Sequence, residues 1–288
     1  MPTTIDAVLP LAPHDYRRAA LCVRSLAHFF PGLGTLWIVY PESAGKDFER
    51  WSSSYPFVRS VSEEELLSSG PGRPILHRVA DVVRPGVAGW YRQQVVKLAF
   101  GQRATTPFYL ALDAGVICTQ PIVADELFVD GAALTVCHEM CHPVWYRTAA
   151  RLLREPMLDC EFGVTPALLH TDSVRGLIAE LSGTERNGRS GRWLSRLGRS
   201  IGWTEYALYY TFLEARGRLE HLHHRVAYSR WFGPSVWGNV RRSWSAQNAF
   251  DARSGGWFCV VSARFPLSIA ELEEAVMPYL EPETSPRR

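Results

Sequence analysis

The chain has 288 residues, of which 47% are hydrophobic and 21% are charged, so it can bury a sizeable core. Its formal net charge of +2 is close to balance, which excludes the broad cationic field of a nucleic-acid-binding protein. No stretch approaches the roughly 18 continuous apolar residues of a membrane-spanning helix, although peripheral contact with a membrane stays open. The first residues lack the pattern of a secretion signal, and six cysteines do not form a disulfide framework in so long a chain. We therefore expect a cytoplasmic protein that binds no nucleic acid.

The N-terminal part of the chain alternates between strand and helix patterns. Apolar runs at 5–11 and 35–40 predict buried strands, and the amphipathic segment 15–30 between them predicts a helix. A strand, a helix and a strand of these lengths form a βαβ unit, in which a right-handed crossover makes the two strands parallel. Beyond this unit we expect a helix at 46–52, a strand at 57–61, a helical turn at 63–67 and a loop at 70–74.

A polar helix face that leads into an acid-tipped strand is the most distinctive feature of the chain. Polar and aromatic side chains recur at helical spacing, with apolar residues on the opposite arc: Trp90, Gln93, Gln94 and Lys97. The apolar run 108–112 then ends at Asp113, as a buried strand does when it delivers a carboxylate to the edge of a sheet. This arrangement suits a charged ligand that contains a ring, and we interpret that ligand as a nucleotide-sugar.

The second half of the chain is less regular. We expect a strand at 132–137, helices at 145–153, 171–181 and 205–214, a mobile connection at 182–200 with a helical turn near Trp193, and a disordered tail at 281–288. Neither a repeat nor a linker is evident. We therefore predict one domain over 1–280, with a nucleotide half at about 1–120 and an acceptor half at 121–280.

Asp113 is the candidate ligand of a metal or a diphosphate. A carboxylate at the carboxyl end of a strand lies where ligands usually bind in an α/β sheet. A divalent cation, Mn²⁺ or Mg²⁺, could bridge that carboxylate to a diphosphate and neutralise the charge of the leaving group. The alternative is an aspartate that caps the following turn. Gly115 allows a close approach of backbone to ligand, but it leaves such a metal one side-chain ligand short.

Three segments resemble a family of GT-A-fold glycosyltransferases that is catalogued only as a domain of unknown function. The first is Gly-Trp-x-x-Gln-Gln-x-x-Lys-Leu at 89–98 with the strand into Leu-Asp-Ala at 112–114, and the others are 162–170 and 204–209. The resemblance extends from the first βαβ unit to about Leu267. It implies a GT-A-like α/β fold, a mostly parallel, twisted sheet flanked by helices. The implied activity is transfer of a sugar from a nucleoside-diphosphate sugar donor to the hydroxyl of a carbohydrate or another acceptor.

The resemblance also implies a set of ligand contacts. GT-A enzymes usually bind the metal and the diphosphate through Asp-x-Asp, whereas this chain has Asp113-Ala114-Gly115, so metal dependence is open. The expected contacts to the nucleotide and its phosphates are Leu11, His14, Trp90, Gln93, Gln94, Lys97, Asp113, Ala114 and Gly115. For the tryptophan and the glutamines, the alternative is packing between helix and sheet with satisfied amides.

Glu205 is the candidate general base. It begins a predicted helix after Thr204, a good N-cap, and an inverting transfer needs a carboxylate near the acceptor hydroxyl. The alternative is that an acid in the first helical turn stabilises the helix dipole. Asp159 and Glu161 are the competing carboxylates, and a retaining route stays open.

Histidines suggest two further sites. His138-Glu139-Met140-Cys141-His142 matches the zinc-protease pattern, which would make the protein a zinc hydrolase. That chemistry needs an unbroken helix, and Pro143 disfavours helical geometry at the residue before it. By the resemblance, a late histidine such as His223 could complete the metal site, with an ordinary surface histidine as the alternative. A catalytically degenerate nucleotide-sugar-binding protein is the other alternative to the transferase.

Overall fold

The computed structural model describes residues 4–44, 54–68, 85–183, 192–237 and 243–281. The helix expected at 46–52, the loop expected at 70–74 and nearly all of the expected tail at 281–288 lie outside these ranges. Within them, no helix is long and apolar enough to cross a membrane.

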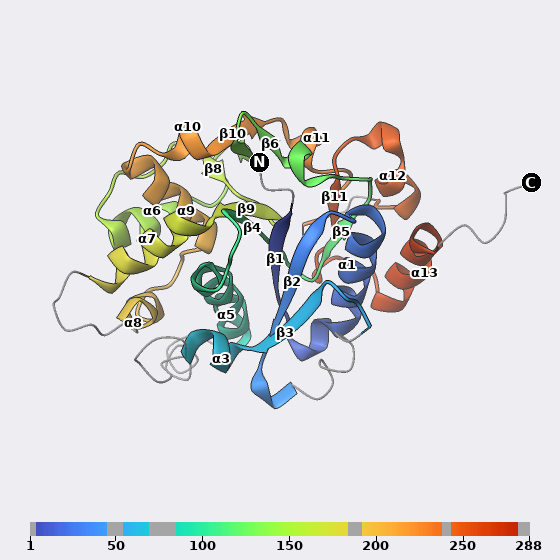
Figure 1. Cartoon of the computed structure of the whole chain (residues 1–288), viewed down its shortest axis with the longest axis horizontal. Helices are drawn as coiled ribbons and strands as arrows, with labels where there is room; N and C mark the ends of the chain where they lie inside the picture. Colours follow the sequence, from blue (N-terminus) through green and yellow to red (C-terminus); the bar gives the residue numbers. More distant parts are fainter. Residues whose placement is uncertain (1–3, 45–53, 69–84, 184–191, 238–242, 282–288) are drawn as a thin grey trace, which may run out of the picture.

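A five-stranded sheet forms the centre of the molecule (Figure 1). Its strands follow the order β3-β2-β1-β4-β9, and they are β1 (Ile5–Pro10), β2 (Leu33–Tyr40), β3 (Val58–Ser62), β4 (Phe108–Ala111) and β9 (Ala167–His170). The first four strands are parallel to one another, and β9 is antiparallel to β4. The predicted α/β class with a mostly parallel sheet is therefore confirmed.

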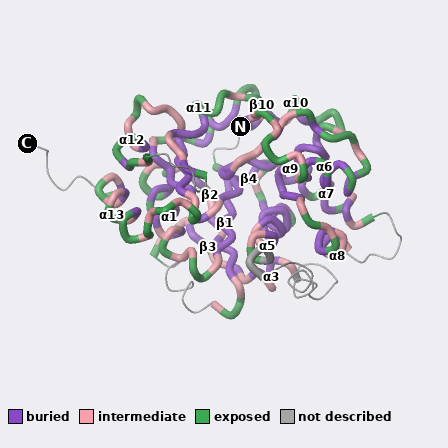
Figure 2. The backbone as a smooth tube through the Cα atoms, turned by 180° about the vertical axis from the view of Figure 1, so that it is seen from behind, coloured by how far each residue is buried: buried purple, intermediate pink, exposed green. Residues whose placement is uncertain are grey.

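Helices cover both faces of this sheet. Figure 1 shows α1 (Tyr16–Phe29) on one side and α5 (Pro85–Ala99) on the other. Side chains of β1 point alternately to the two layers: Ala7 and Leu9 pack in the core with α1, and Val8 packs in the core with α5. All six residues of β1 are buried, and the buried colour of Figure 2 runs through β1 and β4. Such continuous burial is typical of a parallel strand between two helical layers.

The chain reverses its direction across the sheet between β1 and β4. From β1 it passes through α1 to β2 and then to β3, on one side of β1. It returns through α3 (Glu63–Ser68) and α5 to β4, which pairs with the other side of β1. A crevice outside the carboxyl ends of the strands at such a reversal is the usual ligand site of an open α/β sheet.

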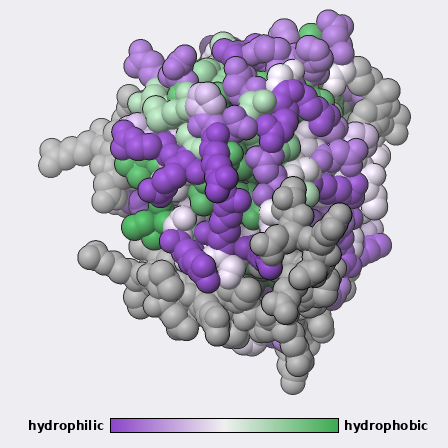
Figure 3. All heavy atoms as spheres, turned by 90° about the vertical axis from the view of Figure 1, so that its left-hand side faces the viewer, coloured by the Kyte–Doolittle hydropathy of each residue, from purple (hydrophilic) through white to green (hydrophobic). Residues whose placement is uncertain are grey.

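The remaining elements surround this sheet. A second sheet has the order β10-β7-β6, with β8 also paired to β7, and β5 pairs with β11. The other strands are β5 (Val116–Cys118), β6 (Phe128–Val129), β7 (Ala132–His138), β8 (Glu161–Phe162), β10 (His223–Val226) and β11 (Phe258–Val260). The other helices are α6 (Pro143–Leu153), α7 (Thr171–Ser182), α8 (Arg192–Gly198), α9 (Glu205–Ala215), α10 (Leu219–Leu222), α11 (Tyr228–Trp231), α12 (Ala246–Phe250) and α13 (Ile269–Leu280). Figure 3 shows hydrophilic side chains, with hydrophobic ones between them, on the face where α6, α7 and α8 lie.

Candidate functional site

A buried lysine joins two carboxylates at the carboxyl end of β4. The Nζ atom of Lys97, on α5, lies 2.6 Å from Oδ1 of Asp113 and 2.9 Å from Oε1 of Glu205. Asp113 follows β4, and Glu205 is the first residue of α9, where the Thr204 hydroxyl accepts a hydrogen bond from the Ala207 amide as N-cap. The motifs that begin at Gly89, Leu112 and Thr204 therefore meet in space, although they are far apart in the chain.

The charges of this cluster do not cancel. Burial alone would lower the pKa of Lys97, but the charges of Asp113 and Glu205 hold that pKa well above its ordinary value. Burial raises the pKa of Glu205, and the charge of Lys97 opposes this rise. Lys97 and Glu205 have side chains that are 1% exposed, whereas that of Asp113 is 37% exposed. One ammonium and two carboxylates leave one net negative charge, and Asp113 presents it towards solvent.

Gln94 completes the shell around Glu205. Its side chain is buried, and its amide nitrogen is assigned to the side that faces Glu205 because only acceptors lie there. In this orientation the amide donates hydrogen bonds to the carboxylate, 3.1 Å from Oε1. The Lys97 ammonium also lies 5.2 Å from the ring centre of Tyr206. Gln94 and Lys97 are thus partners of Glu205 inside the protein.

Asp15 is a second carboxylate near Asp113 that the sequence analysis did not select. Burial raises the pKa of Asp15, His14 and Arg18 oppose this rise, and the nearby charge of Asp113 adds to it. Asp15 ends a helical turn, Pro13–Asp15, that begins shortly after β1, the strand beside β4. Both acids therefore lie at the reversal point of the sheet. An acid shortly after the first strand was the sequence signal for it.

Packing explains why Gly115 replaces the second acid of Asp-x-Asp. A Cβ atom at this position would lie 2.7 Å from the carbonyl oxygen of Val261. The Gly115 carbonyl also accepts a hydrogen bond from the Val261 amide, at 2.9 Å. The backbone that approaches Gly115 so closely is therefore that of the protein itself, in the segment that follows β11, and no side chain fits there.

The other residues expected at the nucleotide are distributed around this cluster. Leu11 and Ala114 are buried, and the Leu11 amide donates to the carbonyl of Val39 on β2. His14 is largely exposed, with Nε2 3.4 Å from Oδ2 of Asp15. Trp90 and Gln93 are half-buried on α5. The Trp90 ring contacts those of Tyr91 and Trp145, at centre-to-centre distances of 4.9 and 5.8 Å.

The expectation that His223 joins Asp113 as a metal ligand is wrong. His223 is buried on β10, where Nε2 lies 2.8 Å from the Tyr209 hydroxyl and the ring packs against Phe108. Phe108 begins β4 and Asp113 follows its end, so at about 3.3 Å per residue the two are roughly 16 Å apart. Burial lowers the pKa of His223 to about 3, which keeps its imidazole neutral.

The zinc-protease pattern does not form the helix it requires, as Pro143 predicted. β7 ends at His138, and α6 begins at Pro143 with His142 as its N-cap residue. Glu161 accepts three hydrogen bonds, at 3.0 Å from the Cys141 amide and at 2.8 Å from each of the amide and Nδ1 of His142. The geometry of a zinc hydrolase is therefore absent from this described segment.

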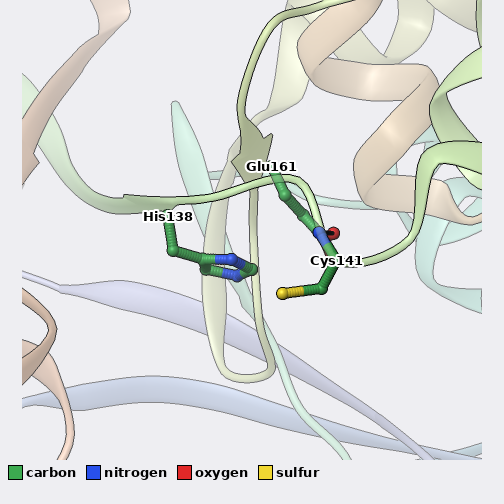
Figure 4. A group of neighbouring side chains, drawn as sticks. All are labelled: His138, Cys141 and Glu161. Carbon is green, nitrogen blue, oxygen red and sulfur yellow. Dashed lines mark hydrogen bonds between the residues drawn. The ribbon is translucent and has the colours of Figure 1, made fainter.

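A mixed cluster of possible ligand atoms remains at the same place. One atom each of His138, Cys141 and Glu161 lie within 4.8 Å of one another (Figure 4). Figure 4 shows the Cys141 sulfur directed towards the His138 ring. Because both Glu161 oxygens are already engaged with the 141–142 loop, this carboxylate serves to hold the loop.

Solved structures with a similar fold define a class. Mouse xyloside xylosyltransferase 1, in its apo form, superposes with a TM-score of 0.52 at 15% identity, over 92% of this chain and 100% of that one. The galactosyltransferase LgtC, in complex with donor and acceptor sugar analogs, gives a TM-score of 0.52 at 10% identity, over 96% and 94%. The fold is thus that of the GT-A glycosyltransferases.

The chain belongs to the family described as "Family of unknown function (DUF6492)", whose profile matches residues 2–284. The resemblance that was based on the 89–98, 112–114 and 204–209 segments is therefore confirmed. No protein with a curated description matches the chain in sequence.

Proposed function

We propose that this protein transfers a sugar from a nucleoside-diphosphate sugar, with uridine diphosphate as the first nucleotide to test, to an acceptor hydroxyl. The observation that carries the proposal is the partly exposed Asp113 carboxylate at the reversal point of the sheet, on a fold shared with sugar transferases. In open α/β sheets, ligands bind in the crevice outside these strand ends. The diphosphate of the donor would therefore lie beside β1 and β4.

The residues at this place fit a divalent cation. Mg²⁺ and related hard cations are commonly held by one or two carboxylates, with substrate phosphates and water as the other ligands. Asp113 offers one carboxylate, and Asp15 is near enough for the two charges to interact. We propose that these two side chains hold Mn²⁺ or Mg²⁺, which when bound would neutralise negative charge on the departing diphosphate.

We assign Glu205 a positioning role in place of the general base. Its carboxylate is enclosed by Lys97 and Gln94, so an acceptor hydroxyl would have to displace both. Because Glu205 balances the charge of Lys97, the carboxylate of Asp113 keeps its negative charge for a cation. Lys97 in turn fixes the position of Asp113 through Oδ1.

Trp90 and Gln93 remain the candidates on α5 for contact with the base or the ribose, because both are half-buried. Gln94 and Lys97 point their polar atoms at Glu205, so we propose that they support the site without direct contact with the nucleotide. A cytoplasmic location and peripheral contact with a membrane stay predictions from the sequence.

Titration calorimetry with nucleoside diphosphates, with and without Mn²⁺, tests the proposal together with release of sugar from the matching donors. We expect binding of at least one nucleotide that Mn²⁺ strengthens, and at least tenfold weaker binding for Asp113→Asn. Asp125→Asn, which changes an exposed acid of the 124–127 turn, is the matched control. Binding that is the same in Asp113→Asn and wild type, or no binding of any nucleoside diphosphate, would overturn the proposal. Binding without sugar release or transfer would favour the nucleotide-sugar-binding alternative.

A further inference from the structure

Two thiols face each other at the base of α6. The Sγ atom of Cys137 lies 2.6 Å from that of Cys160, and both side chains are half-buried. All six cysteines are free in the structure, and Cys141, only four residues from Cys137, is exposed. No group in the site around Asp113 depends on these two thiols, so their proximity has no explanation in the proposed sugar transfer.

The strand pairing fixes the two thiols near each other without a bond between them. β7 and β8 are antiparallel, with Cys137 opposite Phe162 and His138 opposite Glu161. Cys160 directly precedes β8, so it lies diagonally across from Cys137. The Tyr146 hydroxyl of α6 donates to the Phe162 carbonyl at 2.6 Å and accepts from the Phe162 amide at 2.7 Å, which holds α6 to the same strand.

We propose that Cys137 and Cys160 are a redox pair that closes to an intramolecular disulfide by exchange with a low-molecular-weight disulfide. One cysteine, as its thiolate, attacks the external disulfide, forms a mixed disulfide and releases one external thiol. The second cysteine then attacks the protein sulfur of the mixed disulfide and releases the other external thiol. The protein gives up two electrons and two protons, and the external disulfide takes them up to become two thiols.

The surroundings select this pair and set its rate. Burial and the neighbouring Cys160 raise the pKa of Cys137 to about 12, and the charge of Arg225 opposes this rise. Because the thiolate is the reacting species, exchange through Cys137 will be slow at neutral pH and faster in alkaline solution. Burial also raises the thiol pKa values of Cys22 and Cys259 to about 12, and neither lies on this face of β7.

The bond would close the excursion of the chain that contains α6. The segment from 138 to 159 leaves β7 at one thiol and returns to β8 at the other. Trp145, which contacts Trp90, lies within this segment. A cross-link around a loop of this length restricts the unfolded chain, and we expect the oxidised protein to have a Tm about 5 °C above that of the reduced protein.

The experiment equilibrates the purified full-length protein at pH 8.5 with oxidised and reduced glutathione in graded ratios. Free thiols are then blocked with N-ethylmaleimide, and peptides are identified by mass spectrometry. We expect one cross-linked peptide pair that contains Cys137 and Cys160, with Cys141 alkylated throughout. Thermal unfolding of the same samples should follow the fraction of cross-linked protein. In Cys160→Ser the cross-link and the redox dependence of Tm should both disappear, whereas Cys141→Ser should keep both.

Several results would overturn the redox pair. They are alkylation of both thiols in excess oxidised glutathione, a stable mixed disulfide on either one, a cross-link that involves Cys141, and stoichiometric zinc that is released when Cys137 and Cys160 are alkylated. If Cys160→Ser does not fold, the wild-type peptide map alone decides. Because none of these measurements uses a nucleotide, their outcome is independent of the proposed sugar transfer.

Discussion

The ammonium of Lys97 lies 2.9 Å from the carboxylate of Glu205, and both side chains are almost completely enclosed by protein. A buried ion pair of this kind contributes little net stability as a whole, because desolvation of the two charges offsets their attraction. Removal of one partner, however, leaves the other as an uncompensated buried charge. The pair therefore makes each of these two residues sensitive to substitution alone.

Lys97→Met should destabilise the protein by about 3 kcal/mol or more, because Glu205 and Asp113 then face each other without a cation. The double variant Lys97→Met/Glu205→Gln should recover a large part of this loss, since the buried carboxylate is removed together with its partner. Urea unfolding of the wild type, both single variants and the double variant measures the coupling. Strictly additive effects would contradict the pairing.

Glu205→Gln should weaken the effect of Mn²⁺ on nucleotide binding by about tenfold, a free-energy change of about 1.4 kcal/mol. The reason is that Lys97 would then be balanced by Asp113 alone, whose negative charge would no longer be available to a cation. Calorimetric titration of Mn²⁺ in the presence of a saturating nucleotide measures this change. A Glu205 that acts as general base would instead show a lower kcat with unchanged Mn²⁺ affinity, so the two roles are distinguishable.

Asp15→Asn should reduce Mn²⁺-dependent nucleotide binding at least tenfold while it leaves the fold intact, because the side chain is only partly buried at the strand end. Its matched control is Asp172→Asn, which changes an exposed acid in the first turn of α7. Equal nucleotide affinities for the two variants, measured in the same Mn²⁺ buffer, would exclude Asp15 from the cation site.

Gly115→Asp restores the Asp-x-Asp pattern but should not create a better metal site. The new Cβ would meet the Val261 carbonyl oxygen at 2.7 Å, so we expect a loss of stability of about 1–3 kcal/mol from overpacking. Gly115→Ala should lose nearly as much, whereas Gly32→Ala, with no atom within 4 Å of its new Cβ, should not. A stable Gly115→Asp protein with tighter Mn²⁺ binding would show that the 115 and 261 segments separate readily.

His223 should make stability depend on acid pH. Its pKa is about 3 in the folded protein and 6.5 ordinarily, so below pH 6.5 the unfolded chain binds a proton that the folded protein does not. The stabilisation is therefore complete above pH 6.5 and declines as the pH falls towards 3, by about 2–3 kcal/mol at pH 4.5. Urea unfolding at pH 7.5 and 4.5 should show a difference smaller by this amount in His223→Phe. The same pH dependence in both proteins would place the titration elsewhere.

The sequence predicted the first βαβ unit and the main helices because their apolar periodicity extends over many residues. The strands β5, β10 and β11 have only three or four residues each, too few for a pattern, and their pairing depends on distant partners. The antiparallel direction of β9 was likewise not visible, since it follows from where the 154–166 segment turns.

For the candidate site, the sequence identified Gln94, Lys97, Asp113 and Glu205 but not their mutual contacts. Helical spacing shows which residues share a face, yet it does not show that Glu205 would be the group opposite that face. Asp15 was missed because an acid at the start of a helix has an ordinary explanation in the helix dipole. His223 was misassigned because no short-range pattern shows at which end of β4 the β10 strand lies.

The close packing of Gly115 against Val261 has a consequence for how the protein can be divided. The backbone that supports the turn after Asp113 comes from a strand almost 150 residues further along the chain, so about half of the polypeptide separates the two sides of this contact. A fragment that stops before β11 would keep every acid of the proposed cation site and still lose the support that sets their orientation. Limited proteolysis or truncation in the C-terminal third should therefore abolish ligand binding even when the parallel sheet survives.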